Sequence, residues 1–161
     1  MRLHKKLIRF VGKLIPKMQY YKFDLSNFIF QQKIGISTQS RCFLAIQKET
    51  RQKYSTLVSR FSSSNNSLAI DRILAQIKIC FEMNCPTIPK FIGYNVNVSN
   101  QYINTIIITE FIPNGTLDQI ISMSSKNYNN SKWTETQKLI NIYGIAFGMS
   151  YLHSLNIIHR N

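Results

Sequence analysis

The last three residues of the chain, His159-Arg160-Asn161, place an imidazole, a guanidinium and a carboxamide next to one another. They follow a segment of helical periodicity that ends at Tyr151-Leu152-His153, and then a short run, Asn156-Ile157-Ile158. An aspartate at the last position would take a proton from a hydroxyl group, and such general-base assistance is typically worth about 10²–10⁴ in rate. A carboxamide cannot accept that proton, so Asn161 could not act as such a base.

The remaining reactive residues predict neither a disulfide framework nor a metal site. Cys42, Cys80 and Cys85 are an odd and sparse set, and no histidine and cysteine cluster at zinc-binding spacing accompanies them. We therefore expect no metal and a reducing, cytoplasmic environment. No apolar run approaches the ~20 residues that a membrane-spanning helix needs.

The chain is strongly basic, with a formal net charge of +13 over 161 residues. Several bases precede the first acidic residue, Asp24: Arg2, Lys5, Lys6, Arg9, Lys13 and Lys17. Apolar residues recur among them at helical spacing, which predicts a basic amphipathic leader over residues 1–20. Residues 1–17 could bind an anionic membrane surface, each base contributing roughly 1 kcal/mol, which would make the protein membrane-peripheral. A leader packed on the domain is the alternative, and nucleic acid is not an expected partner because no recognised motif accompanies the charge.

After the leader, the apolar pattern predicts an α+β domain. Short apolar and β-branched runs predict five strands, near residues 28–30, 42–46, 54–58, 91–94 and 103–111. Helical periodicity predicts one helix at 70–81, after the third strand, and a longer helix at 134–152 that begins with a capping box, Thr134 and Gln137. The polar stretch 62–67 is predicted to be a flexible loop before the first helix, and a second polar stretch, 122–132, precedes the longer helix.

Three segments, in this order, resemble a protein kinase domain. Residues 107–117 look like the gatekeeper and hinge of the tyrosine-kinase-like serine/threonine kinases, residues 84–88 like the turn after the regulatory helix, and residues 151–160 like the approach to the catalytic loop. The resemblance covers about residues 28–161. It implies a small lobe with a five-stranded antiparallel sheet, a regulatory helix and the hinge over 21–112, and the first helices of the large lobe over 113–161, truncated at the catalytic loop.

The resemblance also assigns three catalytic positions, and each of them carries an unexpected residue. The lysine that holds the ATP phosphates corresponds to Leu57, its glutamate partner on the regulatory helix to Gln76, and the catalytic aspartate to Asn161. A neutral Leu57–Gln76 pair avoids the cost of a lone buried charge, so the fold can persist without the chemistry. A shift of the alignment by a residue or two is the alternative, although no lysine lies within three residues of Leu57.

The glycine-rich loop that would cover the phosphates corresponds to residues 35–42. Of its glycines only Gly35 is present, Ser37 and Ser40 stand at the second and third glycine positions, and Cys42 replaces the usual valine. Glycine lets the backbone approach phosphates closely, so this loop is expected to bind them weakly.

The adenine side of the site is expected to be better preserved. The resemblance makes Thr109 the gatekeeper, gives the backbone of Glu110 and Ile112 the hydrogen bonds to the base, and adds Ser55 and Cys42 to the lining. ATP is therefore the implied cofactor, with weak or absent binding, and Mg²⁺ is not expected.

Together these observations predict a protein-kinase-like fragment whose family activity, ATP-dependent phosphoryl transfer to protein serine or threonine, is lost or severely impaired. It would serve as a pseudokinase scaffold or be a truncated remnant. An apolar stripe on the last helix predicts a protein partner: Leu139, Ile142, Tyr143, Ala146, Met149 and Leu152. Two alternatives are an active kinase whose chain is incomplete and a membrane-surface adaptor that acts through the basic leader.

Overall fold

The computed structural model describes residues 20–36, 40–62, 66–99, 101–126 and 133–159. The chain divides into two compact units. The first comprises the residues up to Met83 together with Lys90–Phe111, and the second comprises Asn84–Pro89 together with Ile112–Asn161. The predicted leader helix, Ser37 and Asn161 lie outside the described residues.

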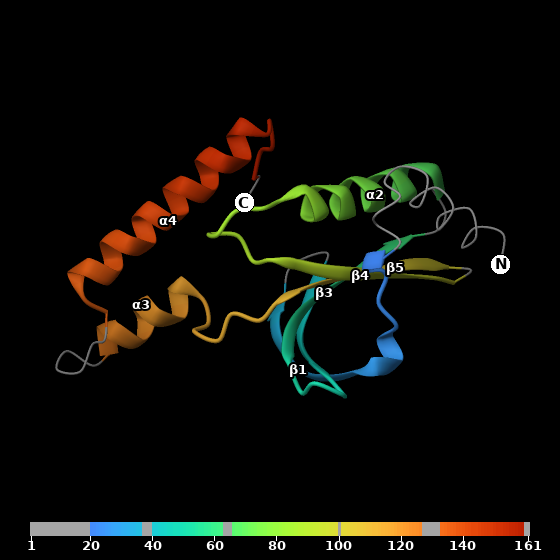
Figure 1. Ribbon diagram of the computed structural model, residues 1–161, viewed down its shortest axis with the longest axis horizontal. Helices are drawn as coiled ribbons and strands as arrows, with labels where there is room; N and C mark the ends of the chain where they lie inside the picture. The colour runs from blue at the N-terminus through green and yellow to red at the C-terminus, as the bar shows by residue number, and fades with distance from the viewer. Residues whose placement is uncertain (1–19, 37–39, 63–65, 100, 127–132, 160–161) are drawn as a thin grey trace. The chain divides into compact units, whose positions relative to one another are not determined.

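The first unit is built on a five-stranded antiparallel sheet in the order β1-β2-β3-β5-β4 (Figure 1). Its strands are β1 (Phe28–Ile36), β2 (Ser40–Gln47), β3 (Lys53–Ser62), β4 (Phe91–Val98) and β5 (Tyr102–Glu110). The predicted α+β class and the five-stranded sheet are confirmed. Most strands are longer than predicted because the backbone pairing continues through polar positions, such as Arg60 opposite Asn104.

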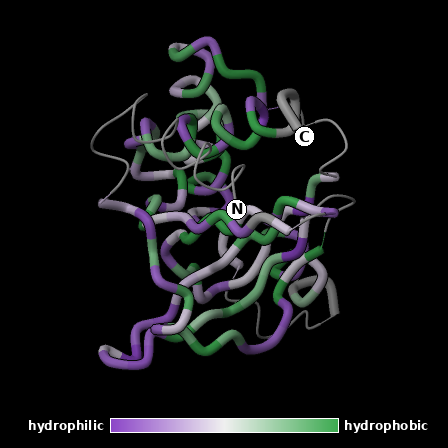
Figure 2. Tube along the Cα trace, turned by 90° about the vertical axis from the view of Figure 1, so that its right-hand side faces the viewer, coloured by the Kyte–Doolittle hydropathy of each residue, from purple (hydrophilic) through white to green (hydrophobic). Residues whose placement is uncertain are grey.

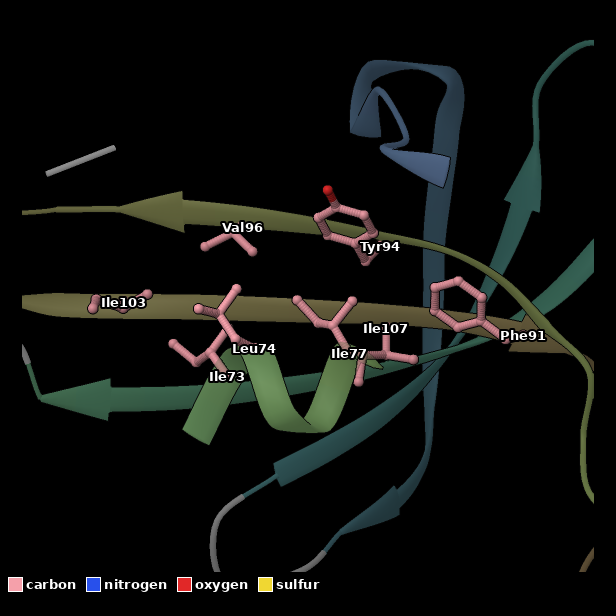
Figure 3. Close-up of a cluster of buried hydrophobic side chains, with 8 residues drawn as sticks. All are labelled: Ile73, Leu74, Ile77, Phe91, Tyr94, Val96, Ile103 and Ile107. Carbon is pink, nitrogen blue, oxygen red and sulfur yellow. The ribbon is translucent and has the colours of Figure 1, made fainter. Parts of the chain in front are cut away.

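Helix α2 (Asn66–Glu82) covers one face of this sheet, where it packs against β3 and β4 (Figure 1). Ile73 and Ile77 are fully buried, and with Leu74 they form a cluster with buried side chains of β4 and β5 (Figure 3). Burying one such side chain stabilises the fold by about 1.5–3 kcal/mol. The helix begins four residues earlier than predicted, so the predicted loop is wrong at Asn66 and Ser67, because these residue types favour helix starts as well as loops.

A short segment before β1 lies along β4, at the edge of the sheet. Lys22 forms a parallel bridge with Tyr94, the Phe23 amide donates to the Tyr94 carbonyl (2.9 Å), and the Asn95 side-chain amide donates to the Phe23 carbonyl (2.7 Å). The close approach depends on Gly93, because a Cβ there would overlap the Phe23 ring and lie 2.5 Å from the Tyr21 carbonyl oxygen. The segment thus covers backbone groups of an edge strand that would otherwise be unpaired.

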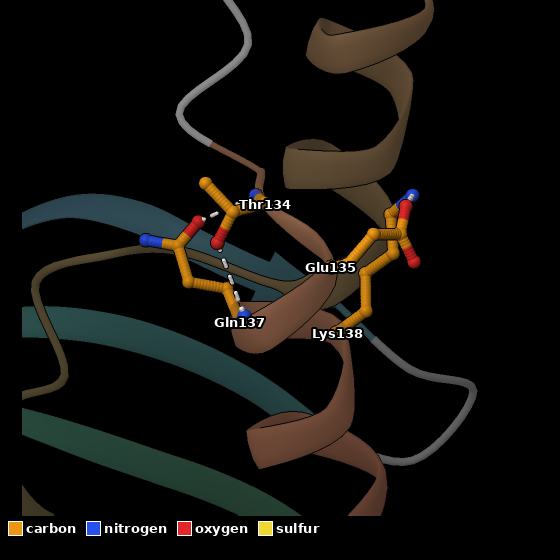
Figure 4. A network of polar contacts seen from close by, with 4 residues as sticks. All are labelled: Thr134, Glu135, Gln137 and Lys138. Carbon is orange, nitrogen blue, oxygen red and sulfur yellow. Dashed lines mark hydrogen bonds and ion pairs between the residues drawn. The ribbon is translucent and has the colours of Figure 1, made fainter.

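The second unit contains α3 (Leu117–Lys126) and α4 (Glu135–Ser154). The predicted capping box is confirmed, since the Gln137 amide donates to the Thr134 hydroxyl (3.2 Å) and the Thr134 amide to the Gln137 side chain (2.9 Å) (Figure 4). Helix α3 continues into the polar stretch that begins at residue 122, where apolar periodicity predicted no helix. It starts with an equivalent pair, in which the Thr116 amide donates to the Gln119 side chain (3.0 Å) and the Gln119 amide to the Thr116 hydroxyl (3.3 Å).

Helix α4 packs against the segment Asn84–Pro89 through one face and leaves an apolar face exposed. The Asn84 amide donates to the Tyr151 hydroxyl (2.9 Å), and Gly148 and Leu152 are buried. The predicted stripe is therefore wrong at Leu152, and Met149 is half-buried. The exposed apolar face of α4 consists of Leu139, Ile140, Ile142, Tyr143, Ile145, Ala146 and Phe147. Figure 2 shows the hydropathy along the whole described trace. Among the described residues, no helix is long and apolar enough to cross a membrane.

Gly93→Ala is expected to destabilise the first unit by about 1–3 kcal/mol, because the added methyl group must displace Phe23 or Tyr21. Urea unfolding measures the change. Gly144→Ala is the matched control, since its Cβ would lie 3.8 Å from Thr87, and removing a glycine from a helix is expected to stabilise it by about 0.5–1 kcal/mol. Equal stability of the Gly93 variant and the unmodified protein would contradict the tight contact.

Tyr143→Lys is expected to raise the concentration at which the protein self-associates, because Tyr143 is 72% exposed in the centre of the exposed apolar face of α4. Static light scattering over a concentration series measures the effect. Ala75→Lys adds the same charge at an exposed position of α2 and controls for net charge. If both variants shift the concentration at which self-association begins by the same amount, net charge rather than the apolar face controls association.

Candidate functional site

The pairing of the strands brings most of the predicted site residues of the first unit to one face of the sheet. One row of directly paired residues runs Gly35, Cys42, Leu57 and Ile107 across β1, β2, β3 and β5. The next row on the same face includes Ser55, which is paired with Thr109. Directly opposite residues of paired strands project from the same face of a sheet, and residues two apart in one strand share a face. We call Cys42, Ser55, Leu57 and Thr109, all half-buried, the Leu57 face.

Leu57 packs against the cluster that joins α2 to the sheet, which includes the fully buried Ile73 and Ile77. Gln76 lies in α2 between these two isoleucines, and it is half-buried. Positions 73, 76, 77 and 80 share one helix face, so Gln76 is on the side of α2 that packs on the sheet. Leu57 and Gln76 thus lie on the two surfaces that pack together, and their roles as the lysine and glutamate positions stay predictions.

Basic side chains of the neighbouring strands lie away from Leu57. Arg60 projects from the opposite face of β3, where its Nε donates to the Asn104 side-chain oxygen (3.2 Å) and its guanidinium lies 5.0 Å from the centre of the Tyr102 ring. Arg41 is paired with Val58, which packs in the core on that opposite face. Lys53 shares the face of Leu57, but it is exposed and lies four residues earlier, roughly 13 Å along the strand.

Cys42 contributes a thiol to the Leu57 face. Burial raises the pKa of this thiol above its usual range, and a hydrogen bond with the backbone of Thr56 only partly opposes the effect. The thiol is therefore protonated at neutral pH and behaves as a small apolar group. Ser40 lies two residues earlier in β2, half-buried and paired with Ser59.

The end of β5 is held by a contact that the sequence did not suggest. The Lys90 amide donates to a Glu110 carboxylate oxygen (2.6 Å), and the Glu110 amide donates to the Lys90 carbonyl (3.0 Å). The two residues are twenty positions apart, and no local motif signals the pair. The contact fixes the backbone that leaves the sheet at the predicted hinge. Ile112, the other predicted hinge residue, is exposed and belongs to the second unit.

The described residues contain no group of three or more histidine, cysteine, aspartate or glutamate side chains that could hold a metal ion. Ser37 and Asn161, at the predicted glycine-loop and catalytic-base positions, lie outside the part of the chain that the structure describes, so their assignments stay predictions.

Comparison with known proteins agrees with this architecture. A family model described as protein tyrosine and serine/threonine kinase matches residues 28–161. The L-type lectin-domain containing receptor kinase V.7 of Arabidopsis thaliana is 26% identical over 103 residues, which cover 62% of this chain and 15% of that protein. The ephrin type-B receptor 3 of Danio rerio is 39% identical over 56 residues, 35% of this chain and 10% of the receptor. A probable serine/threonine-protein kinase of Dictyostelium discoideum is 31% identical over 93 residues, 57% of this chain and 6% of that kinase.

The chain spans less than a fifth of the length of each of these relatives. The family match nevertheless extends over all the strands and helices described above. The resemblance inferred from the hinge, the turn after the regulatory helix and the approach to the catalytic loop is thus confirmed, and the chain belongs to the protein tyrosine and serine/threonine kinase family.

Proposed function

We propose that this chain is a kinase-family domain in which phosphoryl transfer from ATP to a protein hydroxyl group is lost or severely impaired. The observation that carries the proposal is the position of Leu57. A leucine occupies the expected place of the ATP-binding lysine, and it packs on the buried isoleucines of α2. Charge stabilisation of the transferred phosphoryl group supplies most of the catalysis in this family, so its loss at this place is severe.

The size of the effect follows from the missing contacts. A charge-assisted hydrogen bond to phosphate contributes about 1.5–3 kcal/mol, and leucine provides none. Since a factor of ten in an equilibrium constant corresponds to about 1.4 kcal/mol, losing this contact alone weakens the hold on ATP about 10–100-fold. A carboxamide at position 161 would remove general-base assistance as well.

An active kinase is the competing function. The relatives are several times longer than this chain, so a longer product that carries this sequence could contain further catalytic residues. Nothing around Leu57 favours it among the described residues of the first unit, since Arg41 and Arg60 project from the opposite face, and Lys53, on the same face, is exposed and lies roughly 13 Å away. A pseudokinase scaffold would bind a protein through the exposed apolar face of α4. That partner stays a prediction, as does membrane binding by residues 1–17.

Thermal unfolding in the presence of ATP, with and without Mg²⁺, tests the proposal. A ligand at 100 times its dissociation constant stabilises a protein by about 2.7 kcal/mol. We expect no Mg²⁺-dependent shift of the unfolding temperature, because position 57 carries no lysine to pair with the metal-bound phosphates. A large Mg²⁺-dependent rise in the unfolding temperature would overturn the proposal. So would transfer of labelled phosphate from ATP to a protein substrate by the longest protein product that contains these residues.

A double-mutant cycle tests whether Leu57 and Gln76 face one another. Leu57→Lys is expected to cost about 1–3 kcal/mol of unfolding free energy, because the ammonium group would be half-buried against α2. Adding Gln76→Glu is expected to recover about 1 kcal/mol or more of that loss through a new ion pair. Leu57→Met is the control for volume and is expected to cost less than about 1.5 kcal/mol. Strict additivity of the two charged substitutions in urea unfolding would show that the side chains do not meet.

A further inference from the structure

The sequence contains a single asparagine that is followed by glycine, Asn114-Gly115. In such a pair the amide nitrogen of the glycine can attack the side-chain carbonyl carbon of the asparagine, because glycine has no Cβ to hinder the approach. The pair lies between β5 and α3, in residues 112–116, which belong to no helix or strand. Both residues are exposed, so water reaches the reacting groups.

Neither reacting group is held by a close hydrogen bond. Pro113 and Asn114 form a turn, but the structure gives the Gly115 amide no close acceptor and the Asn114 side chain no close partner. Open turns of this kind are common. To react, the amide must turn toward the asparagine side chain and lose its proton, and an existing hydrogen bond would oppose both steps. This turn therefore opposes the reaction less than a hydrogen-bonded segment would.

The start of α3 requires a glycine at position 115. Gly115 has a φ of +75°, in the left-handed region that favours glycine. A Cβ there would lie 2.5 Å from Oε1 of Gln119, the oxygen that accepts a hydrogen bond from the Thr116 amide (3.0 Å). Thr116 in turn caps the helix, since its hydroxyl accepts from the Gln119 amide (3.3 Å). The geometry that begins the helix thus places an unhindered amide beside an exposed asparagine.

Asn156, in the same unit, provides a matched contrast. It is also exposed and lies outside the helices, with a φ of 57°. The next residue, Ile157, is β-branched, and its amide donates to the Leu152 carbonyl (2.9 Å). The bulk of the isoleucine and this hydrogen bond both hinder attack by the amide. Exposure of an asparagine alone is therefore not sufficient for the reaction.

We propose that Asn114 is a site of spontaneous deamidation that modifies the main chain just before α3. The Gly115 amide loses its proton to hydroxide, and its nitrogen forms a bond to Cγ of Asn114. The side-chain nitrogen then leaves as ammonia, after taking a proton from water, and a cyclic succinimide remains. Water opens either carbonyl–nitrogen bond of the ring, which gives aspartate or isoaspartate. The reaction needs only water and hydroxide, and it does not depend on whether phosphoryl transfer is lost.

The two products differ in their effect on α3. Aspartate leaves the main chain unchanged, and a carboxylate near the N-terminus of a helix is favourable. Isoaspartate routes the main chain through the side chain and so adds one carbon atom to it, two residues before Thr116. This extra atom is expected to disturb the capping pair of Thr116 and Gln119 and to loosen the first turn of the helix.

Peptide mapping by mass spectrometry, after incubation of the unmodified protein in heavy-oxygen water at mildly alkaline pH, tests the reaction. Heavy oxygen is expected to enter at Asn114 at least about tenfold faster than at Asn156, where the amide of the next residue must first lose its hydrogen bond. Fragmentation is expected to resolve both aspartate and isoaspartate, since direct hydrolysis would give aspartate alone. Asn114→Gln, which would have to close a larger ring, is expected to incorporate no label at position 114 in the same time. Equal rates at the two asparagines, or aspartate without isoaspartate, would overturn the proposal.

Amide hydrogen exchange over α3 tests the structural consequence. The first turn of the helix, including the Gln119 amide, is expected to exchange about fivefold faster in aged protein that contains isoaspartate than in fresh protein, as for the loss of a typical N-cap. Asn114→Asp adds the charge without the extra main-chain atom and is expected to exchange like the fresh protein. Unchanged exchange in the aged protein would contradict the loosening of α3. Equally fast exchange in Asn114→Asp would assign the effect to charge and overturn the role given to isoaspartate.

Discussion

The packing of α2 on the sheet is the constraint on which the first unit depends. Ile73 and Ile77 are fully buried, and they join β3, β4 and β5 into one apolar cluster that Leu57 extends. A buried ion pair gains little over well-packed apolar residues of similar volume, because desolvation offsets most of the attraction. A leucine at this place can therefore retain the position of the helix without any charge. The packing of α2 on the sheet therefore does not require the lysine and glutamate that the family resemblance leads one to expect at positions 57 and 76.

The registers of the β2–β3 and β3–β5 pairs decide which residues could meet a ligand. Because side chains alternate between faces, a slip of one residue would move Ser55 and Leu57 to the opposite side of the sheet. The observed pairing is protected from such a slip by the core on that side, where Ala45 is fully buried beside Tyr54 and Ile108. The core around Ala45 on one face thereby fixes which side chains lie on the other face. The cluster around Ala45 and the cluster that Leu57 extends therefore cannot be altered independently.

Local patterns predicted most of the fold, and contacts between distant residues account for what they missed. Short apolar and β-branched runs located all five strands, and the Thr134–Gln137 spacing located the start of α4. Thr116 and Gln119 have the same spacing at the start of α3, but this helix was not predicted from it. Strand periodicity predicted which residues of a strand share a face of the sheet. The Glu110–Lys90 contact, in contrast, joins residues twenty positions apart and has no local signature in the sequence. Gly93 within a strand was the single available sign that another backbone segment lies close to it.

The net charge of the chain does not by itself place a base beside Leu57, because the location of each base decides whether it can act. The formal charge is +13, yet Arg60 is engaged with Asn104 and Tyr102 on the opposite face from Leu57. Lys53 lies roughly 13 Å from Leu57, beyond the ~8 Å over which physiological salt screens exposed charges. A phosphate at Leu57 would thus gain little from either residue, since an exposed charge at that distance cannot replace a direct hydrogen bond. The positive charge of the described residues therefore does not replace the missing lysine at position 57.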